Sequence, residues 1–276
     1  MKIRILGAHH FESITSKYSC FVIDGTLAVD AGALTSTLST LEQQDLHGVL
    51  ITHAHFDHIR DIPSLAANLF AAGKQTNIYA TEETHHIIQS HLLNGAVYPD
   101  FFSLPLKAPT LIYHQIAPGE IQTIQGYGVL PLKTNHGENS VGFNITGESG
   151  ETLFYSGDTG PGLSAVWEEI APGSLIIEVT LPNRLRDFAL QSGHLTPELL
   201  RQELEAFLLS KGYLPEITAI HMDRLHEEEI QREMNDISRS LDTKIEFAHE
   251  GLEINLQTDN SRYPKSNIRI PTAVEP

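Results

Sequence analysis

Three histidines and an aspartate fall within six consecutive residues, directly after the apolar run Gly48–Thr52. The segment 52–58 reads THAHFDH and contains His53, His55, Asp57 and His58. Packing does not explain such a cluster, because every buried polar group must be desolvated and paired. On a loop that leaves a strand, His53 and His55 would project together, while Asp57 and His58 turn toward a neighbouring point. Imidazole nitrogens and carboxylate oxygens are ligands that zinc and related ions favour, so the segment predicts a metal site rather than a histidine-rich surface loop.

Four further polar residues follow apolar runs later in the chain. They are His136 in TNHG (134–137), Asp158 in YSGDTG (155–160), His221 in TAIH (218–221) and His249 in FAHE (247–250). Each alone has an ordinary explanation, since a lone histidine is usually a hydrogen-bonded residue and a glycine-flanked aspartate can be a turn. Together they could complete a metal site, in which His221 and His249 compete for one place.

The elements that must position these residues are strands and helices in two β-rich halves. Strands are expected at 3–6, 20–24, 27–30, 48–52, 77–80, 111–116, 129–134, 141–146, 152–156, 174–179, 218–221, 244–248 and 252–256. Helices are expected at 62–72, 82–92, 163–170, 197–211 and 227–241, the fourth with Thr196 as its N-cap. This pattern predicts an α/β fold with two sheets flanked by helices. No composition shift marks a linker, so residues 1–256 are interpreted as one domain and 257–276 as a polar C-terminal tail.

The segment 53–58 resembles the HxHxDH motif of the metallo-β-lactamase superfamily, and the later landmarks occur in that family's order. Asp30, in LAVDAG (27–32), resembles the aspartate that closes the early hairpin and supports the site. The resemblance covers residues 1–256 and implies an αββα sandwich, with two central β-sheets and helices on the outer faces. It also favours His221 over His249, because His221 suits the family pattern after the long helix.

Carried over position by position, the resemblance implies two divalent metal ions, with zinc as the first choice and manganese or iron as alternatives. It implies that one ion is held by His53, His55 and His136, the other by Asp57, His58 and His221, and that Asp158 lies between them. Two such ions can share a water molecule that is deprotonated near neutral pH, and the resulting bridging hydroxide would attack the substrate. Asp57 would also orient this hydroxide.

Two segments narrow the substrate class. The runs LIIEVTLPN (175–183) and SGHLTPE (192–198) resemble the Glu-x-Ser-x-Pro and Gly-His-Leu-Thr-Pro segments of class II cyclic-nucleotide phosphodiesterases. The resemblance implies hydrolysis of a small phosphodiester such as a 3′,5′-cyclic nucleotide, with His194 as general acid or as hydrogen-bond donor to the phosphoryl group. The alternative is that His194 packs against the helix start. The chain departs from the pattern at Phe56, Asp61 and Thr180 and reads HMDR at 221–224, so nucleotide specificity does not follow from it.

Composition restricts the partners and the location. The 276 residues carry a formal charge of -17, from 18 basic and 35 acidic residues, which disfavours binding to nucleic acid or to a membrane surface. The single cysteine, Cys20, excludes an intrachain disulfide. No apolar run reaches the ~18 residues of a membrane helix, and the N-terminal run is too short for a signal peptide, so we expect a cytoplasmic enzyme. A homodimer is expected only by analogy with relatives.

Two other functions stay open at this point. A ribonuclease Z-type RNA endonuclease would share the metal ligands, although the sequence contains no glycine- and lysine-rich arm of the kind that grips tRNA. A non-catalytic sensor on the same fold would bind metal without turnover. Two loops also have alternative interpretations. Arg184 and Arg186 either reach a phosphate or belong to a solvated loop, and the aromatic residues of 94–109 either cover the pocket or pack in the core.

Overall fold

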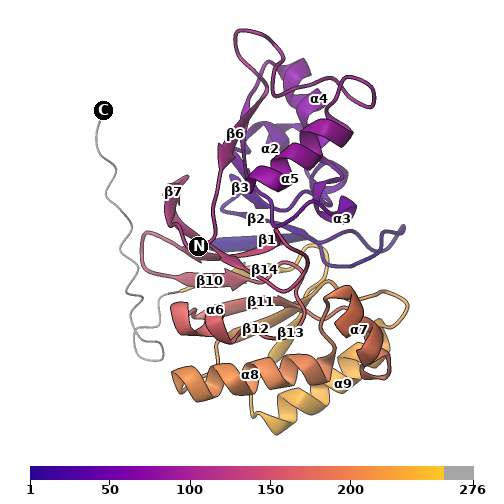
Figure 1. Ribbon diagram of the computed structural model, residues 1–276, viewed down its shortest axis with the longest axis vertical. Coiled ribbons are helices and arrows are strands. Elements are labelled where there is room, and N and C mark those ends of the chain that lie inside the picture. Colours follow the sequence, from indigo (N-terminus) through magenta and orange to yellow (C-terminus); the bar gives the residue numbers. More distant parts are fainter. Residues whose placement is uncertain (258–276) are drawn as a thin grey trace. The chain divides into compact units, whose positions relative to one another are not determined.

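The computed structural model describes residues 1–257, and the rest of the predicted tail, 258–276, lies outside the described residues. The chain divides into two compact units (Figure 1). The N-terminal unit consists of residues 2–117 and 249–255, and the C-terminal unit of Met1, 118–248 and 256–257. Each unit contains one β-sheet and its own hydrophobic core. The interpretation of residues 1–256 as one domain stays a prediction.

The sheet of the N-terminal unit has seven strands in the order β14-β1-β2-β3-β4-β5-β6. The strands are β1 (Lys2–Gly7), β2 (Cys20–Ile23), β3 (Leu27–Val29), β4 (Gly48–Leu50), β5 (Thr76–Ala80), β6 (Leu111–Gln115) and β14 (Glu253–Asn255). From β14 to β3 the strands pair antiparallel, and from β3 to β6 they pair parallel. Because the parallel strands β3 and β4 end at the same edge of the sheet, the loops that follow them lie side by side.

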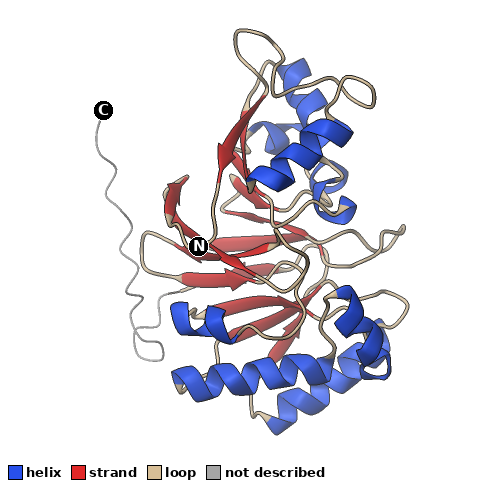
Figure 2. Cartoon of the chain, viewed as in Figure 1, coloured by secondary structure: helices blue, strands red, loops and turns tan. Residues whose placement is uncertain are grey.

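Helix α4 packs against this sheet through apolar residues at the spacing from which the sequence predicts a helix (Figure 2). It buries Ile62, Leu65, Ala66 and Leu69, which recur at intervals of three and four residues, and Gly73 ends it in the left-handed conformation. The helices of this unit are α1 (Leu34–Thr37), α2 (Thr40–Gln44), α3 (Phe56–Ile59), α4 (Ile62–Ala72), α5 (Glu82–Ile87) and the π-helix η1 (Ile88–Leu92). The helix expected at 82–92 is thus an α-helix that continues as a π-helix.

The aromatic residues of the loop 94–109 belong to the core of the N-terminal unit. Phe101 is 4% exposed and lies in the hydrophobic cluster, and Tyr98 and Phe102 pack against it. Of the two interpretations of this loop, core packing therefore describes these three side chains.

The sheet of the C-terminal unit has seven strands in the order β13-β12-β11-β10-β9-β8-β7. The strands are β7 (Gln122–Ile124), β8 (Tyr127–Lys133), β9 (Val141–Thr146), β10 (Thr152–Tyr155), β11 (Ser174–Glu178), β12 (Glu216–Ile220) and β13 (Ile245–Phe247). β7 to β10 pair antiparallel, whereas β10 to β13 pair parallel.

Helices α6, α8 and α9 cover one face of this second sheet (Figures 1 and 2). The helical segments are α6 (Ser164–Glu169), the 3-10 helix η2 (Asn183–Leu185), α7 (Arg186–Ser192), α8 (Pro197–Lys211) and α9 (Glu227–Ser240). Thr196 caps α8 by accepting a hydrogen bond from the backbone N–H of Leu199, as the sequence predicts. The side chains of Trp167 and Phe207 meet edge to face in the core, with ring centroids 5.3 Å apart.

The expected architecture of two sheets flanked by helices is therefore present, and both sheets are mixed. Within residues 1–257, no helix has the length and apolar character needed to cross a lipid bilayer.

Candidate metal centre

In the N-terminal unit, Asp30 organises the loop that carries the histidine cluster. Asp30 follows β3 in the left-handed region, with φ of 58°, and its backbone N–H donates to the carbonyl of Leu50. One carboxylate oxygen, Oδ1, accepts from both the backbone N–H and the hydroxyl of Thr52, each at 2.9 Å. The other oxygen, Oδ2, accepts from Nδ1 of His58 at 2.8 Å. Because Asp30 is fully buried, these donors hold a charge that would otherwise be costly to desolvate.

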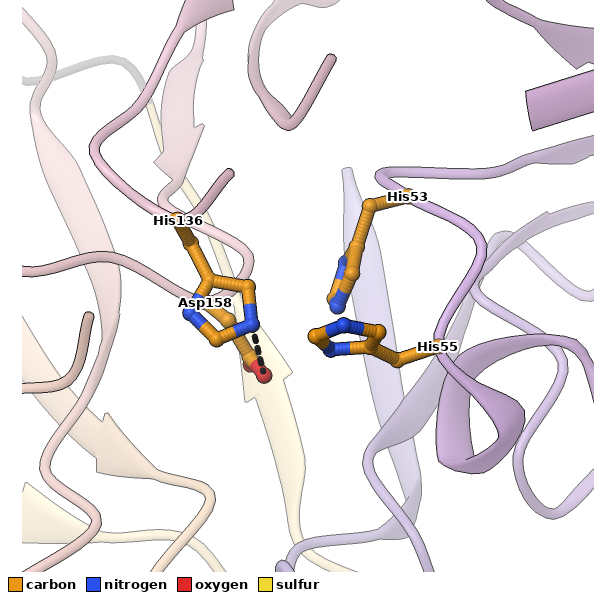
Figure 3. A group of neighbouring side chains, drawn as sticks. All are labelled: His53, His55, His136 and Asp158. Atoms are coloured by element: carbon orange, nitrogen blue, oxygen red, sulfur yellow. Dashed lines mark ion pairs between the residues drawn. The ribbon is translucent and has the colours of Figure 1, made fainter. Parts of the chain in front are cut away.

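The remaining cluster residues lie on the same loop. Nδ1 of His53 is 3.0 Å from the Thr52 hydroxyl, and its ring is 4.6 Å from that of His55 and 4.2 Å from that of His58. His53 and His58 are buried, whereas His55 is exposed (Figure 3 shows His53 and His55). Oδ2 of Asp57 lies 3.4 Å from Nε2 of His58. The predicted cluster His53, His55, Asp57 and His58 therefore converges within this unit.

Gly32 makes this packing possible. A Cβ atom at residue 32 would overlap the backbone carbonyl oxygen of Asp57. The Asp-Ala-Gly sequence after β3 thus combines a supporting carboxylate with a residue small enough for the metal-ligand loop to approach.

In the C-terminal unit, three of the predicted ligands follow strands and meet at Asp158. His136 follows β8, Asp158 follows β10 and His221 follows β12. Nε2 of His136 is 3.7 Å from Oδ2 of Asp158, the ion pair drawn in Figure 3, and Nε2 of His221 is 3.4 Å from Oδ1. All three side chains are buried. His221 has φ of 66°, so a non-glycine residue occupies the left-handed region where the chain turns after β12.

His194 joins this group through a buried carboxylate. Its ring lies 4.6 Å from that of His136 and 5.6 Å from that of His221, and its Nδ1 is 2.8 Å from Oε1 of Glu178. Burial acts to raise the pKa of Glu178, but the charge of His194 and its hydrogen bond outweigh burial and hold that pKa below its usual range. The Glu178 carboxylate therefore stays ionised and fixes the His194 ring.

The donor set fits divalent metal ions. Nδ1 of His136 donates to the carbonyl of Gly193 and Nδ1 of His58 donates to Asp30, because neither partner can give a proton. In the neutral ring, Nε2 then carries a lone pair, and in both cases it points toward a carboxylate oxygen 3.4–3.7 Å away. Two acceptors face each other favourably when a cation lies between them. Fixing Nδ1 by a hydrogen bond and presenting Nε2 is the usual arrangement of metal-ligating histidines.

Comparison with known proteins places the chain in a family. A model of the β-lactamase superfamily domain matches residues 22–222. The chain belongs to the β-lactamase superfamily.

Among curated proteins, ribonuclease Z from Methanocaldococcus jannaschii is 30% identical to this chain over a stretch of 98 residues. The stretch covers 33% of this chain and only 28% of the length of that relative. Among solved structures, unliganded yeast PDE1 has a TM-score of 0.79 at 19% identity, over 92% of this chain and 98% of that one. The metallo-β-lactamase fold protein YhfI from Bacillus subtilis has a TM-score of 0.71 at 19% identity, over 92% and 98% of the two chains. At 19% sequence identity, the two solved structures show a shared fold and no more. Their TM-scores confirm the predicted metallo-β-lactamase fold.

The structure separates two pairs of alternatives left by the sequence. His249 is exposed in the N-terminal unit, with Nδ1 3.2 Å from the carbonyl of Glu250, whereas His221 is buried beside Asp158. Arg184 is paired with Glu229 at 3.1 Å and its side chain is 53% exposed, and Arg186 is exposed as well. Both arginines are therefore solvated, but they lie in the 3-10 helix η2 and in helix α7 rather than in a loop.

Three residues of the site were missed by sequence analysis. Thr52 and Thr180 hold histidine nitrogens, and Glu178 holds His194. A buried strand that ends in a carboxylate was the available signal for Glu178, because a charge there requires partners. Thr52 gives no such signal, since a hydroxyl at a strand end is common, whereas Thr180 occupies the serine position of the Glu-x-Ser-x-Pro segment.

Proposed function

We propose that this superfamily member is a metal-dependent phosphodiesterase that hydrolyses a small phosphodiester, with a 3′,5′-cyclic nucleotide as its substrate. The observation that carries the proposal is His194, buried beside His136 and His221 and held by the ionised Glu178. A histidine so placed can supply a proton in the same region as the metal-binding side chains, which phosphodiester cleavage requires.

Two divalent ions, zinc in the first instance and manganese or iron as alternatives, are proposed as cofactors. The ligands would be His53, His55 and His136 for one ion, Asp57, His58 and His221 for the other, and Asp158 for both. When bound, the ions would lower the pKa of a water molecule and neutralise charge that builds up on the phosphoryl oxygens. The hydrogen bonds from Nδ1 of His58 and His136 support Nε2 coordination at both positions.

The protein's own groups then have separate tasks. Asp57 would orient the attacking water toward phosphorus. His194, protonated at both nitrogens, keeps Nδ1–H on Glu178 and donates Nε2–H to the departing oxygen as the phosphorus–oxygen bond breaks. Glu178 stabilises the charged ring before this transfer and keeps it oriented afterwards.

A ribonuclease Z-type activity is the second candidate, because of the 30% identity to the archaeal ribonuclease Z over 98 residues. The formal charge of -17 favours the smaller substrate, since a long RNA backbone meets an acidic surface over a large area. A small phosphodiester presents one or two charges, which bound metal ions can neutralise locally. The homodimer stays a prediction from the sequence.

Hydrolysis of 3′,5′-cyclic AMP and cyclic GMP by the full chain, reloaded with Zn²⁺ or Mn²⁺, tests the proposal. We expect turnover that falls by about 10²- to 10⁴-fold in a His194→Ala variant, the range of general acid catalysis, while bound metal stays unchanged. His221→Ala should lose metal, whereas the matched control His249→Ala should keep both metal and activity.

Three other outcomes would contradict the proposal. Cleavage of precursor tRNA without hydrolysis of cyclic nucleotides would establish the ribonuclease alternative. Metal binding without turnover of either substrate would favour the sensor. A metal-free chain after reloading would remove the basis of all three functions.

A further inference from the structure

The hydroxyl of Thr180 connects the buried carboxylate to a proposed metal ligand. Thr180 Oγ1 is 2.7 Å from Oε2 of Glu178 and 2.8 Å from Nδ1 of His221. Thr180, Glu178 and His221 are all at most 1% exposed. The next contact of the hydroxyl, to Nδ1 of His194, is longer at 3.3 Å. The three short-range partners thus form a buried chain from carboxylate to hydroxyl to imidazole.

The direction of each hydrogen bond in this chain follows from the donors available. The hydroxyl of Thr180 donates its single proton to Oε2 of Glu178 in the 2.7 Å contact. Backbone N–H groups of Thr159, Thr180 and Leu195 also donate to this carboxylate, which leaves it no role as a donor. The 2.8 Å contact with His221 therefore needs its proton from the ring, and Nδ1–H donates to Oγ1.

We propose that Thr180 is a positioning residue that fixes His221 in the Nδ1–H tautomer and thereby presents Nε2 as a metal ligand. The inference rests on the metal site of the proposed function and is independent of the substrate. Nε2 of His221 is 3.4 Å from Oδ1 of Asp158, so the tautomer set by the hydroxyl directs a lone pair toward that carboxylate. One carboxylate thus controls two imidazoles: Glu178 binds His194 directly and reaches His221 through Thr180.

The N-terminal unit contains the same arrangement. Asp30 accepts directly from Nδ1 of His58 at 2.8 Å and from the Thr52 hydroxyl at 2.9 Å. That hydroxyl is 3.0 Å from Nδ1 of His53. In both units a buried carboxylate therefore binds one histidine directly and a second through a threonine. The chain differs at residue 180 from the serine of the phosphodiesterase pattern, and the relay explains this substitution because threonine keeps the hydroxyl.

The test compares Thr180→Val, which removes the hydroxyl with little change of shape, with Thr180→Ser, which retains it. Thr146→Val is the matched control, because Thr146 is a buried threonine of the same unit whose hydroxyl has no hydrogen-bond partner within residues 1–257. Zinc affinity is measured on the full chain by competition with a chromophoric chelator. The tautomer of His221 is read from two-bond nitrogen–proton correlations of the ¹⁵N-labelled protein after zinc is removed.

In the wild type we expect the Nδ1–H tautomer at His221. Thr180→Val should lose this tautomer preference and weaken the binding of one zinc ion by about 10- to 100-fold, as loss of outer hydrogen bonds to metal ligands does. Thr180→Ser and Thr146→Val should match the wild type. An Nε2–H tautomer in the wild type would overturn the inference without any variant, so the test survives a Thr180→Val protein that does not fold. Wild-type zinc affinity in a folded Thr180→Val would overturn it too, whereas a wild type that binds none of zinc, manganese and iron would refute the proposed function itself.

Discussion

Replacing Gly193 by alanine should displace the proposed metal ligand His136, in addition to straining the backbone at residue 193. Gly193 ends helix α7 with φ of 72°, and its carbonyl accepts the hydrogen bond from Nδ1 of His136. A Cβ at this position would be 3.1 Å from that same Nδ1 and 3.1 Å from the carbonyl oxygen of Asn135. Both neighbours must give way by a few tenths of an ångström, and His136 cannot do so without changing its hydrogen bond.

Gly212 provides a matched control for the conformational part of this effect. It ends helix α8 with φ of 78°, and a Cβ there would meet nothing within 4 Å. Gly212→Ala should therefore lower the free energy of unfolding by only about 1–2 kcal/mol, the penalty for alanine in the left-handed conformation. Gly193→Ala should cost the same amount and about 1–3 kcal/mol more for the overpacked contact.

Urea unfolding, followed by the fluorescence of the single tryptophan in the C-terminal unit, measures both variants, and chelator competition measures zinc affinity. At about 2–4 °C per kcal/mol for a chain of this size, the two variants should also differ visibly in thermal unfolding. Zinc affinity should fall in Gly193→Ala and stay unchanged in Gly212→Ala. Equal unfolding energies and equal zinc affinities for the two variants would refute the packing argument.

Three further predictions concern stability and reactivity. Burial raises the pKa of the Cys20 thiol, so it should resist thiol reagents in the folded protein and react only on unfolding; rapid labelling of the native chain would contradict this. The backbone N–H of Ser39 lowers the pKa of Glu42 to about 2, so its stabilisation is present above about pH 4.5 and lost as the pH falls toward 2. Glu42→Gln should accordingly cost about 0.5 kcal/mol at pH 7, discounted for exposure, and nothing near pH 2 in urea titrations. Glu203→Gln should cost about 1–3 kcal/mol and change the Trp167 emission, because the buried carboxylate accepts from that indole at 3.1 Å; an unchanged spectrum and stability would count against it.

Strong periodicity made the long helices and the ligand-bearing strand ends predictable. The helices expected at 62–72 and 197–211 have those bounds, because their buried apolar residues recur at intervals of three and four residues and a left-handed glycine ends each helix. Helix α7, Arg186–Ser192, was not predicted, since Ala189 is its only buried residue and such a short segment has no readable apolar face. Its position matters nonetheless, because it ends at the glycine that binds His136.

The ligand residues could be named from spacing, but their orientation could not. Asp30 and His221 both occupy the left-handed region, which a sequence predicts for glycine and seldom for other residues. The role of Glu178 depends on donors from three separate segments of the chain, at residues 159, 180 and 194–195. Such convergence is a property of the folded unit, so the position of Glu178 at a strand end indicated a buried charge but did not identify the groups that donate to it.

Each unit prepares its own share of the proposed ligand set before any metal is bound. In the N-terminal unit Asp30 and Thr52 fix His58 and His53, and in the C-terminal unit Glu178 fixes His221 through Thr180. Imidazoles held in one tautomer by buried hydrogen bonds lose little conformational entropy on coordination, and less of the binding free energy is spent on ordering them. Replacing either threonine by a residue without a hydroxyl should therefore weaken metal binding, although no proposed metal ligand is changed.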